Sequence, residues 1–522
     1  MRPFLGAERL GGAVQRRFSV LVALLLAALL HLARADRMSL WIDEIFTLRN
    51  AGQPSVAAIV AAAAATERRP PLSFLVFHLW LGRFPNVEFA WRWLPAAFAV
   101  LAVAAGVRLA ERVQRGSGPL AALLLAVSPY LLLYGAMVRA YSLTLLLGLL
   151  MTLFLVEERP LAYTVVAAAG LWTDYLLWFL VAAHALWLLG WKGSKMRAGE
   201  RRAWFFVFLA LGIAALPLIA PALGQRRQVL VAADLATTPL GIALKLGYTP
   251  YAYLLGETLF PWSPWAWLGL IGVAVALVGL RGPVTPARRL LILSAGLPVL
   301  AIIVLLSLLA TDLPFVNVPS RAIVAAPIVL IALAAGLHRL PPRIGRLAVG
   351  AILVANSVAL INLYTDTNYI NPIYAVPARE VATTIRAQAM PDALVLAEQD
   401  TALPFYLTHQ PGGPPVLAPG AVEAVMQLPP EVWLFSFGRD RTRVLEGEPR
   451  ARAWLVANGY TLVAATAYVP TDPTYAAVKH RLLGREAYAA KATLEQWRRQ
   501  NRRVAETRKP DAWCSERRTI TI

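Results

Sequence analysis

Cysteine is almost absent from this sequence, because Cys514 is the only one among 522 residues. A single cysteine excludes an intrachain disulfide and any metal cluster built from cysteines. Acidic residues are also scarce, with 30 Asp and Glu against 50 Lys and Arg. No internal repeat with a period of about 20–50 residues is evident, so a repeat architecture is not indicated.

Apolar residues, in contrast, make up 58% of the chain, and the mean hydropathy is +0.57. Apolar runs long enough to cross a bilayer as helices recur along residues 1–365. We therefore predict an α-helical polytopic membrane protein. The formal net charge of +20 lies largely in short loops between these runs. This distribution indicates the positive-inside signal and contact with anionic membrane lipids, and it argues against a nucleic-acid partner.

The basic loops predict about eleven spans, with ten to thirteen permitted because the apolar segments 72–84 and 160–173 are short. This count places the N-terminus in the cytoplasm and the C-terminal part outside the cell membrane. The predicted spans are 18–35, 90–110, 118–136, 140–156, 160–173, 175–190, 203–222, 264–280, 289–310, 321–338 and 346–364.

Two predicted outer loops are long. The first, 36–89, holds an alanine-rich helical stretch at 55–66 and a short interfacial or re-entrant helix at 72–84. The second, 223–263, carries clustered tyrosines and tryptophans. Such aromatics form interfacial belts, and a loop of this length also suits a lid or a ligand-binding element. The sequence leaves both interpretations open.

Beyond the last span the composition changes. We predict a membrane domain over 1–370 and an exterior soluble α/β domain with a basic tail over 371–522. A helix is expected at 378–390, and a further helical pattern covers 482–500. Short alternating segments predict strands at 393–398, 431–437 and 460–469.

An acid pair, Asp43-Glu44, follows the first predicted span directly. Adjacent carboxylates are poor membrane anchors, since Trp, Tyr, Lys and Arg serve that purpose. They suit proton abstraction or metal binding at the interface. A solvated pair that caps the following helix is the structural alternative.

Five segments, taken in order, resemble one family. They are SLWIDEIFT (39–47), RRPPLSFLVFHLW (68–80), EFAWRWLPAAFAVLAVAAGVRLAERV (88–113), SPYLLLYGAMVRAYSL (128–143) and PSRAIVAAPIVLIALAAG (319–336). Together they are similar to motifs of the GT-C superfamily of integral membrane glycosyltransferases. The resemblance is specifically to bacterial relatives of protein O-mannosyltransferases and aminoarabinose transferases, over roughly the first 365 residues.

The resemblance implies a hexosyl- or pentosyltransferase that uses a polyprenyl-phosphate-linked sugar and an acceptor hydroxyl on a protein, a lipid or a polysaccharide. It implies that Asp43 is the catalytic base of an inverting single displacement, and that Glu44 orients the acceptor or the loop. Cations near the departing phosphate would stabilise its charge. Arg139, Arg321 and Arg69 are the candidates, and snorkelling at the interface is the alternative for the first two.

The sequence also departs from the family pattern. Arg69 stands where His commonly precedes Pro-Pro-Leu, residues 136–138 lack the usual Gln-Glu, and Asp174 replaces the His of a Tyr-Thr-His-Tyr motif. Asp174 is either a replacement carboxylate or a helix cap. Glu67 and Tyr141 are additional candidates, although a plain ion pair with a neighbouring arginine would also explain Glu67.

No two-ligand spacing supports a metal site, and the sequence leaves open whether a divalent metal is required. Two other functions remain alternatives. The first is a non-catalytic relative that binds a lipid-linked glycan, which the departures favour. The second is a lipid or solute transporter, for which mid-membrane acids and repeated halves would be expected.

Overall fold

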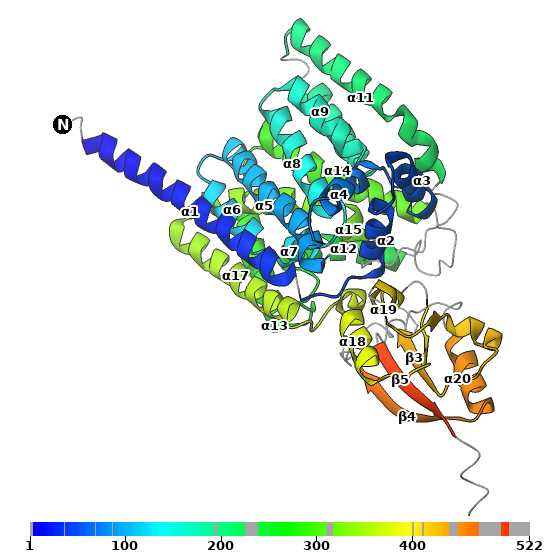
Figure 1. The fold of residues 1–522 in the computed structure, drawn as a ribbon. Helices are drawn as coiled ribbons and strands as arrows, with labels where there is room; N and C mark the ends of the chain where they lie inside the picture. The colour runs from blue at the N-terminus through cyan, green and yellow to red at the C-terminus, as the bar shows by residue number, and fades with distance from the viewer. Residues whose placement is uncertain are drawn as a thin grey trace, which may run out of the picture. The chain divides into compact units, whose positions relative to one another are not determined.

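In the computed structural model the chain forms two compact units, Met1–Val376 and Pro377–Ile522 (Figure 1). The residues that the structure describes are 4–35, 37–67, 69–85, 87–192, 196–224, 239–308, 317–398, 401–409, 412–437, 447–468 and 492–500.

Helices are the only regular secondary structure among the described residues of the first unit. Helix α5 packs against α1, α6 and α8, and α13 packs against α16 and α17. The helices are α1 (Phe4–Ala35), α2 (Ile42–Ala51), α3 (Val56–Thr66), α4 (Leu72–Leu81), α5 (Glu88–Val113), α6 (Gly118–Ala126), α7 (Pro129–Gly135), α8 (Tyr141–Val156), α9 (Pro160–Leu171), α10 (Leu177–Trp187), α11 (Ala198–Gly224), α12 (Pro239–Leu255), α13 (Pro264–Gly279), α14 (Pro286–Leu308), α15 (Val318–Arg321), α16 (Ala325–Arg339) and α17 (Pro342–Tyr364). A π-helical turn, Leu188–Lys192, continues α10, and a 3₁₀ turn, Pro372–Ala375, follows α17.

Five described helices are long and apolar enough to cross a membrane, and the bent pair α6 and α7 allows a sixth. The five segments are Val14–Ala35, Glu88–Val113, Ala198–Ile219, Pro286–Leu305 and Pro342–Tyr364. The remaining predicted spans correspond to shorter apolar helices of 10–17 residues. The count of about eleven spans stays a prediction.

The predicted span 118–136 is broken where α6 meets α7, with a bend of 61°. Ser128 caps α7 by accepting the N–H of Leu131, and Pro129 occupies the first turn. Proline has no N–H and so cannot continue the hydrogen bonds of α6. The bend brings Tyr130 and Tyr134, one turn apart, onto the same face of α7.

The first long loop has the predicted helical stretch, as α3, and the predicted short apolar helix, as α4. The second long loop differs from its prediction, because residues 239–255 form a helix, α12. Its buried residues include Lys245, Thr249 and Tyr253 at helical spacing. Polar groups on the buried face lower the hydropathy of this segment, which is why it does not resemble a span.

The C-terminal unit contains one mixed sheet in the order β2-β1-β3-β5-β4. The pairs β1/β2 and β1/β3 are parallel, whereas β3/β5 and β4/β5 are antiparallel. Residues of β1, β3 and α20 form its core, among them Leu396, Leu434 and Leu455. The strands are β1 (Leu394–Leu396), β2 (Val416–Leu417), β3 (Glu431–Phe437), β4 (Tyr460–Ala467) and β5 (Ala492–Arg499), and the helices are α18 (Ala378–Gln388), α19 (Leu403–His409) and α20 (Gly447–Ala457), with a 3₁₀ turn at Pro419–Ala424.

The helix expected at 378–390 and the three predicted strands are present in this unit. The helical prediction for 482–500 is wrong over residues 492–499, which form β5; residues 482–491 lie outside the described ranges. Strand β5 lies between β3 and β4, and its Glu495 pairs with Arg452 of α20 at 2.9 Å. Pairing on both edges overrides the helix propensity of this charged segment.

Candidate active site

The two neighbouring acids of the pair occupy different surroundings. Helix α2 begins after Trp41, so Asp43 and Glu44 both lie in its first turn, where the helix dipole favours carboxylates. The Asp43 side chain is 32% exposed, whereas that of Glu44 is 0% exposed. Consecutive helical residues point about 100° apart. One acid therefore reaches the surface and the other points into the protein.

Glu44 is fully bonded inside the protein. Its Oε2 accepts hydrogen bonds from the backbone N–H of Trp41 and from Arg92, each at 3.1 Å. Its Oε1 accepts the backbone N–H of Val138 at 2.8 Å. A buried carboxylate needs both a charge partner and hydrogen bonds, and Glu44 has both. It joins α2 to α5 and to the turn before α8.

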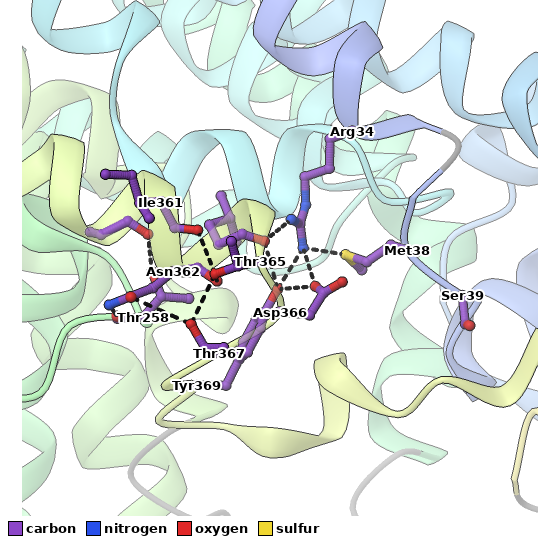
Figure 2. Close-up of polar contacts among 12 residues, drawn as sticks. Arg34, Met38, Ser39, Thr258, Ile361, Asn362, Thr365, Asp366, Thr367 and Tyr369 are labelled. Carbon is purple, nitrogen blue, oxygen red and sulfur yellow. Dashed lines mark hydrogen bonds and ion pairs between the residues drawn. The ribbon is translucent and has the colours of Figure 1, made fainter. Parts of the chain in front are cut away.

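Two buried arginines hold the segment that leads into α2. Arg92 donates to the carbonyl oxygens of Met38 and Ser39, at 2.8 and 3.1 Å. Arg34, at the end of α1, donates to Tyr369 Oη at 2.6 Å, and its Nη2 lies 2.6 Å from Met38 Sδ. Figure 2 shows Arg34 reaching toward Met38 and Tyr369 together. The start of α2 is therefore anchored to both α1 and α5.

Arg139 connects Asp43 to a third acid, Glu67. It lies in the turn between α7 and α8 and is 3% exposed. Its Nη1 donates to the Asp43 carbonyl at 2.8 Å and to the Thr47 hydroxyl at 2.9 Å. The same nitrogen lies 2.6 Å from Glu67 Oε2, and Nη2 lies 3.5 Å from Asp43 Oδ2. Burial disfavours the charge of Arg139, but Glu67 and Asp43 outweigh burial and raise its pKa.

Arg69 completes this group, which we name the Asp43 cluster: Asp43, Glu67, Arg69 and Arg139. The Nε of Arg69 lies 3.6 Å from Glu67 Oε2, so two acids and two bases balance in charge. Glu67 Oε1 and Arg139 Nε are buried and make no hydrogen bond with the residues that the structure describes. Such atoms are uncommon in folded proteins and require an explanation.

A second group of buried polar side chains surrounds Glu257, just beyond α12. Glu257 Oε1 accepts a hydrogen bond from Tyr134 Oη at 3.0 Å, and that hydroxyl lies 3.2 Å from Tyr374 Oη. The Tyr130 ring lies 4.7 Å from the Tyr134 ring and 5.1 Å from the Tyr253 ring. We name these five residues the Glu257 cluster.

A glycine sets the close approach of Glu257 to α7. Gly256 has a φ of +83°, and a Cβ there would lie 2.7 Å from Pro129 Cβ. Only glycine meets both conditions without strain. Glu257 itself is 1% exposed and lies outside the candidate spanning helices. Burial raises its pKa to about 8, although the hydrogen bond from Tyr134 opposes the shift, so the carboxyl is protonated at neutral pH.

The Glu257 cluster contacts two segments that carry predicted site residues. The Trp41 ring, two residues before Asp43, meets the Tyr374 ring edge-on with centroids 5.2 Å apart. On another side, Tyr253 Oη donates to the carbonyl oxygens of Pro319 and Ala322, at 3.2 and 2.7 Å. These two carbonyls lie on either side of Arg321 in sequence. The cluster therefore adjoins both the Asp43 segment and the Arg321 segment.

The predicted site residues thus do not all lie together. Asp43, Glu67, Arg69 and Arg139 form one group, and Glu44 fixes the first turn of α2, which carries Asp43. Tyr141 follows the Arg139 turn, with its ring 5.1 Å from that of Tyr134. Arg321 is half-buried and makes no ion pair or hydrogen bond with the part of the chain that the structure describes.

Asp174 is separate from the other predicted residues in its contacts. Its Oδ1 accepts the backbone N–H of Leu176 at 3.0 Å, so the side chain caps the turn before α10. No metal site is apparent either: within the described ranges, no group of three or more His, Cys, Asp and Glu side chains is arranged to hold an ion.

Arg92, Thr47 and the Glu257 cluster are functional candidates that the sequence motifs alone do not indicate. Arg92 lies inside a segment that carries the family resemblance, so an arginine within an apolar helix was an available signal. Glu257 was hidden among aromatic residues of the second long loop. Its partner Tyr134 is 123 residues away in the chain, and no local pattern reveals such a pairing.

The fold resembles that of ArnT, a protein of known structure. ArnT from Cupriavidus metallidurans in the apo state matches with a TM-score of 0.53 and 12% identity, covering 94% of this chain and 98% of ArnT. The same enzyme bound to undecaprenyl phosphate matches with a TM-score of 0.51 and 11% identity, covering 93% and 98%. An oligosaccharyltransferase from Archaeoglobus fulgidus has a TM-score of 0.45 at 10% identity, covering 73% and 60%.

No family model matches this sequence, and no curated protein does. The likeness to ArnT covers nearly all of both chains and shows that the two share a fold. The protein is therefore a multi-pass helical membrane protein with a C-terminal unit built on a mixed sheet.

Proposed function

We propose that this protein is a glycosyltransferase that moves a hexosyl or pentosyl group from a polyprenyl-phosphate donor to an acceptor hydroxyl. The observation that carries the proposal is the partly exposed carboxylate of Asp43, held beside the buried Arg139, in a chain with the ArnT fold. ArnT binds undecaprenyl phosphate, and we extend that class of ligand to this chain.

In the proposed reaction Asp43 is the general base. It removes the proton of the acceptor hydroxyl as the acceptor oxygen bonds to C1 of the sugar and the bond from C1 to the phosphate oxygen breaks. A single displacement of this kind inverts the configuration at C1. Polyprenyl phosphate is a good leaving group, so the reaction requires a base and little acid assistance.

Glu44 has a positioning role in this proposal. It is closed off from solvent and bonded on both oxygens, so it cannot reach an acceptor without leaving Arg92 unpaired. Instead it fixes the first turn of α2, from which Asp43 projects. Thr47 and Arg139 contribute to the same end through the Asp43 carbonyl.

The departing phosphate requires cations, and the arginines differ in availability. Arg139 already faces two carboxylates at 2.6 and 3.5 Å, so most of its charge is neutralised locally. Arg321 is half-buried without an ion pair among the described residues, and Arg69 has only a long contact to Glu67. We assign the phosphate to Arg321 and Arg69 first, with Arg139 as a shared donor through its Nε.

The proposed orientation places the site and the C-terminal unit on the outer face of the cell membrane, with the N-terminus in the cytoplasm. The positive-inside distribution of arginines supports this orientation. The acceptor, whether protein, lipid or polysaccharide, would then meet a donor that arrives through the membrane.

Transfer by the reconstituted wild-type protein tests the proposal. The full chain is placed in liposomes with a panel of undecaprenyl-phosphate-linked hexoses and pentoses and candidate acceptors, and the products are analysed by mass spectrometry and by anomeric configuration. An inverted glycoside is the expected product. Binding of these lipids without transfer by any donor would favour a non-catalytic relative, and proton- or sodium-driven uptake would favour a transporter.

A further inference from the structure

Two buried polar atoms of the Glu257 cluster lack hydrogen-bond partners in the described part of the chain. Glu257 Oε2 and Tyr130 Oη make no hydrogen bond with the residues that the structure describes, and the two residues are 1% and 0% exposed. Leaving such atoms unpaired is unfavourable, and a site built to bind a substrate hydroxyl has this property before the substrate arrives.

We propose that the Glu257 cluster is a sugar-recognition subsite, in which Glu257 Oε2 and Tyr130 Oη bind a hydroxyl group of the sugar that the donor carries. The inference rests on the proposed glycosyl transfer and adds to it a substrate feature and the residues that read it. Neither residue takes part in the proton transfer or in phosphate binding.

The position of the cluster supports this assignment. The base, Asp43, belongs to a segment that contacts Tyr374 through Trp41. Arg321, which has no ion pair among the described residues, belongs to a segment that contacts Tyr253 through Pro319 and Ala322. In a donor, the sugar lies between the atom that the acceptor attacks and the lipid phosphate. We therefore place a sugar that bridges Asp43 and Arg321 against these tyrosines.

The chemistry of the cluster favours a neutral hydroxyl. Burial keeps the pKa of Glu257 at about 8, so at neutral pH its carboxyl offers one donor and one acceptor. Tyr130 Oη offers the same pair. Two neutral groups of this kind match a hydroxyl, which also donates and accepts, whereas a phosphate would require cations.

Both atoms are closed off from solvent in this structure, so the inference includes a side-chain movement that admits the hydroxyl. Burial decreases toward Asp43, since Tyr374 is 5% exposed and Trp41 is only partly buried. We therefore expect the sugar to enter the cluster at the contact between Trp41 and Tyr374.

Tyr130→Phe is the sharpest test, because it removes a hydroxyl that bonds to none of the described residues. We expect an unchanged melting temperature and an unchanged Kd for undecaprenyl phosphate, which carries no sugar. The KM for the sugar-bearing donor should rise by about tenfold, the value of one hydrogen bond, while the KM for the acceptor stays the same. A rise in the acceptor KM alone would assign the hydroxyl to the acceptor and overturn the inference.

Tyr163→Phe is the matched control. Its hydroxyl is also fully buried, but it lies 3.0 Å from His184 Nδ1 of α10 and so already has a partner. We expect it to lower the melting temperature and to leave the donor KM unchanged. Equal donor KM values for Tyr130→Phe, Tyr163→Phe and the wild type would overturn the subsite.

Deoxygenated donors separate this inference from the proposed function. Removing the recognised hydroxyl from the donor should raise the wild-type KM by about tenfold or more and raise that of Tyr130→Phe by less, because only the bond to Glu257 is then left to lose. If the wild type transfers no sugar from any donor, the proposed function fails. If it transfers normally and every deoxy donor behaves alike in both proteins, only the subsite fails.

Discussion

The Asp43 cluster and the Glu257 cluster are adjacent, and they accommodate buried acids in opposite ways. In the Asp43 cluster, arginines balance the carboxylates and one acid remains partly exposed. In the Glu257 cluster, tyrosines surround a single carboxyl and burial raises its pKa to about 8. Ion pairing preserves charge for proton transfer, whereas burial among hydroxyls produces a neutral group suited to recognition.

The same contrast occurs between two consecutive residues. Asp43 and Glu44 share the first turn of α2, yet Glu44 is committed to Arg92, Trp41 and Val138, and Asp43 keeps a surface-facing carboxylate. Asp43, the proposed base, therefore differs from Glu44, which positions it, in solvent exposure and hydrogen-bond partners more than in residue type.

The largest effect on stability is expected from Glu44→Gln. Removing this charge leaves the buried Arg92 guanidinium without its carboxylate at 3.1 Å, and breaking one partner of a buried pair costs about 3–5 kcal/mol. Chemical unfolding in detergent measures the loss. Asp43→Asn is the matched control and should change stability by under about 1 kcal/mol, since its pair with Arg139 is longer and partly exposed. Equal losses in the free energy of unfolding for the two variants would contradict the different roles assigned to Glu44 and Asp43.

The pH dependence of stability should identify Glu257. Its pKa is raised from 4.5 to about 8 in the folded protein, so between these values the folded state binds more protons than the unfolded state. The contribution of Glu257 is fully present below about pH 4.5 and is lost as the pH rises through 8, by at most ~1.4 kcal/mol per pH unit. Glu257→Gln should remove this slope, and an unchanged slope in the variant would contradict a neutral Glu257.

Arg321→Gln should weaken the donor complex by tenfold or more, because a charge-assisted hydrogen bond to phosphate contributes about 1.5–3 kcal/mol. Titration of the reconstituted protein with undecaprenyl phosphate measures Kd directly. Arg339→Gln, on an exposed arginine that bonds to Gln114, is the control and should leave Kd unchanged. If the two variants bind alike, the phosphate lies elsewhere.

The smallest effect is expected from Asp174→Asn. Among the described residues, the Asp174 side chain accepts a hydrogen bond only from the backbone N–H of Leu176, and Asn caps such turns equally well. Transfer rates should stay within about twofold of the wild type, since no proton transfer is assigned to this residue. A loss comparable to that of Asp43→Asn would make Asp174 part of the chemistry.

Much of the membrane unit was predictable, because the length of the apolar runs and the basic loops between them indicate where helices begin and end. The Asp43 cluster was predictable in part, since Asp43, Arg69 and Arg139 each lie in a segment that resembles a family motif. The structure brings them together, and it adds Arg92, whose role depends on Glu44 and on the carbonyls of Met38 and Ser39.

The rest depended on contacts between distant segments. Helix α12 carries Lys245 and tyrosines on its buried face, so hydropathy alone does not mark it as a helix of the core. Glu257 meets tyrosines from α7 and from the chain beyond α17, and only packing unites them. Strand β5 has a helix-like composition, and its pairing with β3 and β4 overrides that preference.

The rate of sugar transfer by Asp43→Asn tests the central claim most directly. The variant is reconstituted with the donor that the wild type uses, and its melting temperature and its Kd for undecaprenyl phosphate are measured alongside. The account predicts a rate lower by about 10²–10⁴-fold, the contribution of a general base, with folding and lipid binding preserved. Transfer at the wild-type rate would contradict it.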